Sequence, residues 1–91
     1  NAVCATVLVS MEDEITARFR QVAVAEAAQG TGIGKMLMVF AHETAKARGA
    51  QQALIHARHT AIPFYERLGY VAEGEFFPEH TVPHIIMRRK L

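Results

Sequence analysis

The feature that most limits how this chain folds is a glycine-rich turn, Gly30-Thr31-Gly32-Ile33-Gly34, between two segments of different periodicity. Before the turn, residues 15–25 are rich in the β-branched and apolar side chains of a strand. After it, apolar side chains recur at the i, i+3, i+4 and i+7 spacing of an amphipathic helix. A strand, a tight turn and a helix in this order begin a βαβ unit.

The predicted helix begins at Ile33 and ends before Gly49, with Lys46 and Arg48 in its last turn. Its predicted core face consists of Ile33, Met36, Leu37, Phe40, Ala41, Thr44 and Ala45. Residues 53–57 then supply the second, parallel strand of the unit.

Further elements surround this unit. Residues 2–10 form a strand, and the polar segment 11–14 turns it into a hairpin with the strand at 15–25. Thr60 is the predicted N-cap of a short helix that ends at Leu68 before Gly69. Strands at 70–77 and 83–90 follow, separated by residues 78–80. The fold class is therefore α/β, in the order β-β-α-β-α-β-β, with a mixed, largely antiparallel sheet.

The second strand changes phase within its own length. Apolar side chains occupy odd positions from Ile15 to Phe19 and even positions at Val22 and Val24. Because strand side chains alternate with a period of two, this shift predicts a one-residue bulge near residues 20–21.

Size and charge narrow the function classes. The chain has 91 residues, so we expect one domain spanning 1–91. A net charge of +1, with acids and bases interspersed, argues against a nucleic-acid or anionic membrane surface as partner. The single cysteine, Cys4, cannot form an internal disulfide, which favours a cytoplasmic setting. Because the chain starts with Asn1 inside a strand-like run, we expect the domain to be N-terminally incomplete.

A glycine turn ahead of a helix can bind phosphate through its backbone amides, or it can be a tight turn without a ligand. A Walker-type loop needs Gly where Gln29 stands and Ser or Thr where Met36 stands. A dinucleotide fingerprint needs a third Gly at Lys35 and an acid near residue 50, and this chain has neither. Both of these nucleotide motifs are thereby excluded.

The pattern Q/R-x-x-G-x-G/A does fit. It is present as Gln29-Gly30-Thr31-Gly32-Ile33-Gly34, directly after the strand containing Val22-Ala23-Val24. A second block, Pro63-Phe64-Tyr65-Glu66-Arg67-Leu68-Gly69-Tyr70, has the form F-Y-E-x-x-G-F/Y. Together they make the chain resemble the GNAT superfamily of N-acetyltransferases. The ending Pro83-His84-Ile85-Ile86-Met87 resembles the small ElaA-like and YjcF-like bacterial members.

The resemblance implies acetyl-CoA as co-substrate and a primary amine as acceptor. The implied cofactor contacts are Val22, Ala23, Val24, Gln29, Gly30, Thr31, Gly32, Ile33, Gly34, Lys35 and Arg58. Backbone of the first three pairs with the pantetheine arm, and amides of residues 30–35 hold the pyrophosphate. Lys35 and Arg58 add charge to the phosphates or face solvent. Tyr65 is the implied catalytic acid, which protonates the departing thiolate.

The identity of the general base is left undecided by the sequence. Many relatives have Glu where this chain has Gln21, which cannot accept a proton. His56, His59, His80 and His84 are candidates by chemistry, and water is another. The histidines lack the spacing of a metal set, so no metal is expected.

Two alternatives to catalysis remain. Members of the family carry a first strand and two helices before the segment that matches residue 1, and these form one wall of the acceptor site. A chain without that wall can be a non-catalytic acyl-CoA-binding module. It can also be an interaction module that dimerises through residues 2–9 or 84–90.

Overall fold

The predicted order of helices and strands is confirmed in the computed structural model, which describes residues 5–24 and 30–91 and, at Gln21 and Val24, the backbone alone. Residues 2–4 of the predicted first strand lie outside the described residues, as does Gln29. The elements are β1 (Ala5–Met11), β2 (Thr16–Val24), α1 (Ile33–Ala47), β3 (Gln52–Arg58), η2 (His59–Ala61), α2 (Ile62–Arg67), β4 (Val71–Glu79) and β5 (Val82–Lys90).

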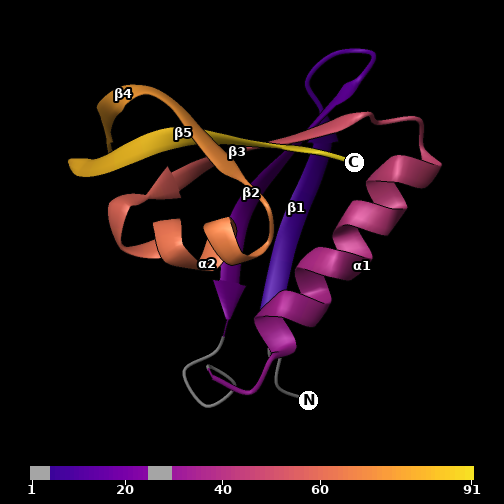
Figure 1. Cartoon of the computed structure of the whole chain (residues 1–91), viewed down its shortest axis with the longest axis horizontal. Coiled ribbons are helices and arrows are strands. Elements are labelled where there is room, and N and C mark those ends of the chain that lie inside the picture. Colours follow the sequence, from indigo (N-terminus) through magenta and orange to yellow (C-terminus); the bar gives the residue numbers. More distant parts are fainter. Residues whose placement is uncertain (1–4, 25–29) are drawn as a thin grey trace.

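The five strands form one sheet in the order β1-β2-β3-β5-β4 (Figure 1). The pair β2–β3 is parallel and is connected by α1, whereas the other three pairs are antiparallel. This arrangement confirms the predicted mixed sheet with a central βαβ unit.

The parallel strands β2 and β3 separate part of the way along. Their pairing runs from Thr16–Gln52 to Phe19–Ile55, and beyond it the two arrowheads point apart (Figure 1). The edge of β2 that faces β3 is therefore not paired with β3 over residues 20–24, where the two strands diverge.

The predicted bulge is confirmed, one residue further along. Thr6 pairs with Ala23 and Leu8 with Arg20, so one residue of β1 lies opposite Gln21 and Val22 of β2. A two-against-one arrangement increases local twist, which turns the end of β2 away from β3.

The core lies on one face of the sheet. It contains Ala17 and Phe19 of β2, Ala53, Ile55 and Ala57 of β3, and Ile85 and Met87 of β5. Helix α1 and the α2–β4 segment cover this face, with Tyr65 and Tyr70 buried in it. The other face carries polar side chains such as Arg18 and His56.

The predicted core face of α1 was partly wrong. The helix buries Gly34, Met38, Ala41, His42 and Ala45, whereas Met36 and Phe40 are each 70% exposed. Apolar side chains extend around more than half of the helix, so periodicity alone does not decide which flank packs. The small side chains at 34, 41 and 45 decide it, because they let the helix approach the sheet closely.

Two predicted boundaries also move. The 3₁₀ turn η2 holds residues 59–61, so α2 begins at Ile62 with Ala61, and not Thr60, as its N-cap. The β4–β5 hairpin turns at His80 and Thr81, both with positive φ, so Pro78 and Glu79 belong to β4. No helix in the described part of the chain has both the length and the apolar character needed to cross a membrane.

Candidate functional site

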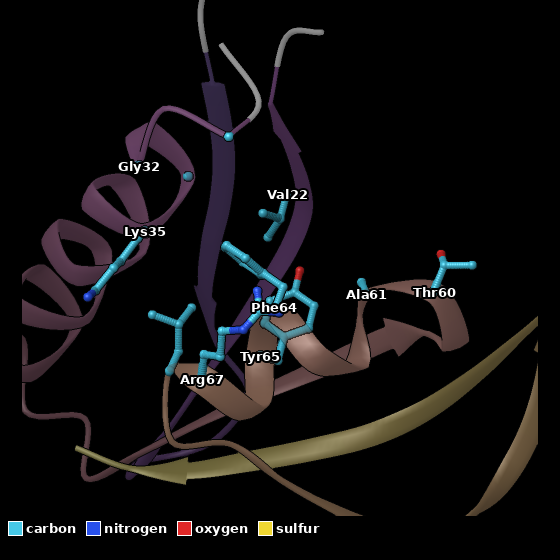
Figure 2. Close-up of a pocket in the computed structure, with 11 residues that line it drawn as sticks. Val22, Gly32, Lys35, Thr60, Ala61, Phe64, Tyr65 and Arg67 are labelled. Carbon is cyan, nitrogen blue, oxygen red and sulfur yellow. The ribbon is translucent and has the colours of Figure 1, made fainter.

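A first cavity of about 670 Å³ lies between the glycine turn and α2 (Figure 2). It is lined by Val22, Gly30, Gly32, Gly34, Lys35, Thr60, Ala61, Phe64, Tyr65, Arg67 and Leu68. The two sequence blocks that are far apart along the chain therefore face each other across one cavity.

The glycine turn has the backbone of an anion-binding site. Gly30 and Gly32 have φ of +79° and +86°, a left-handed conformation that side-chain-bearing residues rarely adopt. Gly32 caps α1 without a side-chain hydrogen bond, and the first turn of the helix contains no acid. The first amides of a helix lack intrahelical acceptors and carry its partial positive charge, so this end is suited to a phosphate.

The predicted cofactor residues divide between two cavities. Gly30, Gly32, Gly34 and Lys35 line the first cavity alone, Ala23 and Arg58 line only a second one, and Val22 lines both. Thr31 and Ile33 belong to the turn without lining either cavity, and Lys35 extends along α1 away from the turn (Figure 2). Gln29 lies outside the described residues.

The second cavity, of about 510 Å³, lies at the opening between β2 and β3. It is lined by Arg18, Phe19, Arg20, Val22, Ala23, Ile55, His56, Arg58, Ala61, Tyr65, Glu79, His80 and His84. Three arginines and three histidines surround one carboxylate, so the lining is polar and contains groups that can exchange protons.

Tyr65 lines both cavities, together with Val22 and Ala61. Its side chain is 6% exposed and packs edge-on against Phe64 and Tyr70, with ring centroids 5.1 and 5.6 Å away. Burial raises the pKa of the Tyr65 phenol to about 12. The hydroxyl therefore keeps its proton at neutral pH and is available as a proton donor between the two cavities.

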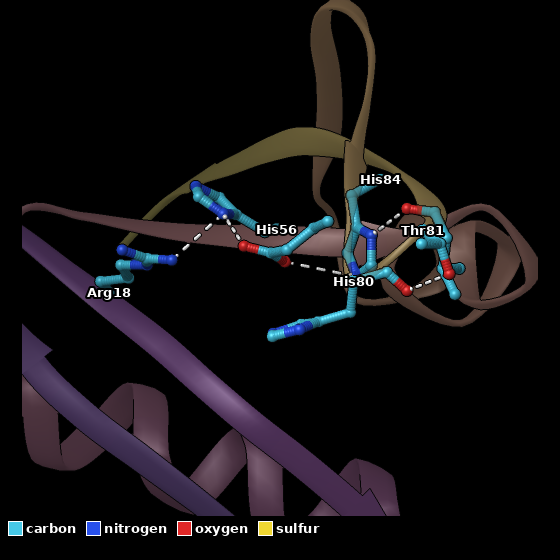
Figure 3. Close-up of polar contacts among 7 residues, drawn as sticks. Arg18, His56, His80, Thr81 and His84 are labelled. Atoms are coloured by element: carbon cyan, nitrogen blue, oxygen red, sulfur yellow. Dashed lines mark hydrogen bonds and ion pairs between the residues drawn. The ribbon is translucent and has the colours of Figure 1, made fainter.

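Glu79 lies between His56 and His84 in a polar cluster of the second cavity. Figure 3 draws the contacts of this cluster, with Arg18, His56 and His84 labelled. Its Oε1 lies 3.2 Å from His56 Nδ1, and its Oε2 lies 3.4 Å from His84 Nε2. His84 Nδ1 lies 2.8 Å from the carbonyl oxygen of Val82, and Arg18 Nη2 lies 3.1 Å from His56 Nδ1. The hydrogen bond with His56 is the main cause that lowers the pKa of Glu79.

The sequence singled out His56, His80 and His84 but missed Glu79. All four line the second cavity, whereas His59, in η2, lines neither. Glu79 was predicted to lie in the connection between the strands at 70–77 and 83–90. The sequence feature that could have identified it is its position in a hairpin with the strand that contains His84. Within residues 5–24 and 30–91, no three His, Cys, Asp or Glu side chains gather as a metal site would require.

Known proteins share the fold of this chain. Residues 5–91 match the family model described as an acetyltransferase (GNAT) domain. The crystal structure of a Lactobacillus plantarum protein assigned as an N-acetyltransferase is 32% identical, with a TM-score of 0.92 over 97% of this chain and 60% of that one. Escherichia coli ElaA is 29% identical, with a TM-score of 0.76 over 93% of this chain and 57% of its own.

A GNAT family acetyltransferase from Elizabethkingia anophelis, crystallised with acetyl-CoA bound, has the same fold at 19% identity. Its TM-score is 0.84 over 100% of this chain and 71% of that one. The chain spans 51% of the length of the curated Bacillus subtilis relatives that it matches at 26% and 25% identity.

Proposed function

Because the chain belongs to the GNAT acetyltransferase family, we propose that it transfers an acetyl group from acetyl-CoA to a primary amine. The observation that carries the proposal is the meeting of two cavities at Tyr65, one beside the glycine turn and one lined by Glu79 and three histidines. A transferase of this kind needs such a junction, because its two substrates must reach one carbonyl carbon from different sides.

Acetyl-CoA occupies the first cavity in this proposal. Its pyrophosphate accepts hydrogen bonds from the amides of residues 30–35. The amides of the pantetheine arm pair with residues 22–24, where β2 has no pairing with β3, as an added strand would. The Elizabethkingia anophelis enzyme supports this choice of ligand, since the same fold holds acetyl-CoA there. A contact of Arg58 with the phosphates stays a prediction, because Arg58 lines the second cavity.

The chemistry at the junction is attack of a neutral amine on the thioester carbonyl carbon. A C–N bond forms and the C–S bond breaks, and the leaving thiolate takes the proton of the Tyr65 hydroxyl. Because burial disfavours the phenolate, the Tyr65 phenol is protonated at neutral pH, and its O–H can donate to the sulfur as negative charge develops there. The amine enters from the second cavity, which Tyr65 also lines.

The test is calorimetric titration of the chain with acetyl-CoA, free CoA and ATP, using two matched glycine variants. Gly32 and Gly49 both have positive φ, and a Cβ on either meets nothing within 4 Å. Gly32→Ala and Gly49→Ala should therefore lose similar stability, about 1 kcal/mol each. Only Gly32→Ala should weaken binding of both CoA species, by about tenfold, because its Cβ occupies the approach of the phosphate.

Binding of both CoA species without binding of ATP supports the proposal. A folded chain that binds no CoA, or equal effects of the two glycine variants on CoA affinity, contradicts it. The alternative of a non-catalytic acyl-CoA-binding module predicts the same binding but no acetylation of any primary amine.

A further inference from the structure

Three neighbouring strands bring one carboxylate between two imidazoles. His56 comes from β3, Glu79 from the end of β4 and His84 from β5. Their positions follow from the sheet register, in which Arg58 and Phe77 both pair with His84 and Glu79 pairs with Val82. The cluster opens into the cavity that Tyr65 lines, so a group bound there lies in the same cavity as the proposed proton donor.

The proton positions on His84 are constrained by its neighbours. The Val82 carbonyl oxygen can only accept, so His84 Nδ1 carries the proton of that hydrogen bond. In the neutral imidazole, Nε2 then bears a lone pair that faces Glu79 Oε2 at 3.4 Å. Two lone pairs at this distance repel each other unless a proton is shared between them or a cation contacts both. The His84 side chain is 7% exposed and the Glu79 side chain is 34% exposed, so water reaches this pair from the Glu79 side.

The position of the proton on His56 is also constrained, because two residues contact its Nδ1. Arg18 can only donate and ionised Glu79 can only accept, so one nitrogen cannot satisfy both at once. Arg18 Nε, in addition, is a buried polar atom without a partner in the described part of the chain. One partner of His56 Nδ1 is therefore unsatisfied, either Arg18 Nη2 as a donor or Glu79 Oε1 as an acceptor, and both belong to side chains that line the second cavity.

On the basis of the proposed function, we propose that Glu79 binds the ammonium group of the acceptor and that His84 Nε2 removes its proton. The ammonium approaches from the cavity side and donates one N–H to Glu79 Oε2 and another to His84 Nε2, which are too close together, at 3.4 Å, to hold it between them. One N–H proton passes to His84 Nε2, and the resulting imidazolium is paired with Glu79. The freed lone pair attacks the thioester carbon.

The remaining protons balance. When the C–S bond breaks, the thiolate takes the Tyr65 proton, and the second proton from the new C–N nitrogen restores the Tyr65 phenol. His84 releases its proton to solvent after the products leave. The acceptor class is therefore a small primary amine that is cationic at neutral pH, and Glu79 and His84 are catalytic residues for it.

Other charged groups line the same cavity and contribute to any pH profile. They are Arg18 and Arg20 of β2, His56 and Arg58 of β3, Tyr65 of α2 and His80 of the hairpin turn. Variants at His84 must therefore be compared with a histidine outside the cavity. His59 provides that control, because it lies in η2 and lines neither cavity.

The decisive variant is His84→Asn. The Asn amide nitrogen can take the place of Nδ1 and keep the bond to Val82, but it offers nothing in place of Nε2. Acetyl transfer to ethanolamine, 2-phenylethylamine and spermidine is measured with EDTA present. We expect kcat at pH 7 to fall about 10²–10³-fold, while acetyl-CoA affinity stays within about twofold. Trifluoroethylamine, already neutral at pH 7, should be acetylated at nearly equal rates by both proteins.

Glu79→Gln should raise KM for the cationic amines about tenfold or more and leave acetyl-CoA affinity unchanged, whereas His59→Asn should change neither. The inference is overturned if His84→Asn keeps the wild-type rate and pH profile, or if it slows trifluoroethylamine as much as the cationic amines.

A second readout separates this inference from the proposed function. Ethylammonium chloride is titrated into the protein with ¹⁵N-labelled histidines, with and without acetyl-CoA, and the histidine resonances are followed by NMR. Shifts of the His56 and His84 resonances that Glu79→Gln abolishes support the ammonium site even if acetyl-CoA fails to bind. Acetyl-CoA binding with no response of either imidazole to ethylammonium overturns the site and leaves the proposed function standing.

Discussion

Two buried tyrosines in the same core have different surroundings. Tyr65 lines both cavities, and its hydroxyl has no hydrogen bond to another residue that the structure describes. The Tyr70 hydroxyl lies 2.6 Å from His42 Nε2 and reaches neither cavity. One hydroxyl is therefore available to a substrate, and the other is part of the packing.

Removing each hydroxyl should separate catalysis from stability. Tyr65→Phe should lower kcat about 10²–10³-fold with little change in unfolding free energy, because the hydroxyl makes no hydrogen bond to another residue that the structure describes. Tyr70→Phe should cost about 1 kcal/mol of stability and leave kcat unchanged. Steady-state acetyl transfer and urea unfolding measure both. Unchanged turnover in Tyr65→Phe would remove Tyr65 from the mechanism.

His42 is a buried titratable group on the core side of α1. Arg89 Nη1 lies 2.7 Å from its Nδ1 and can only donate, so the proton of neutral His42 is on Nε2 and is donated to Tyr70. Burial, and secondly the charge of Arg89, lower the pKa of His42 to about 4. The imidazole therefore stays neutral in the folded chain at physiological pH.

This depressed pKa predicts acid sensitivity. The unfolded chain, with an ordinary histidine pKa of 6.5, binds the proton more tightly than the folded chain does. Stability should therefore be full above pH 6.5 and fall as the pH drops towards 4, by up to about 3 kcal/mol from this group. Urea unfolding between pH 4 and 7 measures it. His42→Gln, which cannot titrate, should show a flatter profile, and equal profiles would refute the assignment.

At the scale of the element, α1 presents one apolar flank to the sheet and another to the outside. Met38 is fully buried, whereas Met36, two residues earlier on the same helix, is 70% exposed. One helix therefore holds the same residue type in a buried and in an exposed position. Because the intrinsic helix propensity of the two positions is equal, a difference in stability between variants reports on packing.

Truncating each methionine tests which flank packs. Met38→Ala should lower the unfolding free energy by about 2–4 kcal/mol, because it leaves a cavity in the core. Met36→Ala should change it by less than about 0.5 kcal/mol. Chemical denaturation of the two variants is the measurement. Equal losses would mean that the exposed flank is covered when the protein is in solution.

At the scale of the whole molecule, the proposed acetyl-CoA cavity is built by elements that are distant in the chain. Residues of β2, the glycine turn and α2 line it, and β2 does not continue its pairing with β3 there. A ligand in this cavity would connect β2, α1 and α2 where strand pairing does not.

Ligand binding should therefore stabilise the chain as a unit. Acetyl-CoA at about 100 times its Kd should raise the unfolding free energy by about 2.7 kcal/mol, and ATP should raise it by nothing. Thermal melts at increasing acetyl-CoA concentration measure this, with Gly49→Ala expected to respond like the parent chain and Gly32→Ala to respond more weakly. An equal response to ATP would point to unspecific phosphate binding.

The sequence by itself determined the elements, their order and the glycine turn. These depend on short-range physics: the period of apolar side chains, the left-handed backbone at Gly30 and Gly32, and the phase shift at the β2 bulge. The family motifs are also short contiguous segments. For that reason the glycine turn and Tyr65, which line the first cavity, could be picked out in the sequence.

Only the tertiary structure decided which flank of α1 is buried and how the second cavity is lined. The apolar side chains of α1 cover an arc wider than its contact with the sheet, so the helix could pack in more than one rotation about its axis. Close packing of its small side chains selects one of these rotations. Glu79 meets His56 and His84 because β3, β5 and β4 pair in a particular register, between residues far apart in the chain. Local periodicity does not encode that register, so the proton-exchanging cluster is a property of the folded sheet.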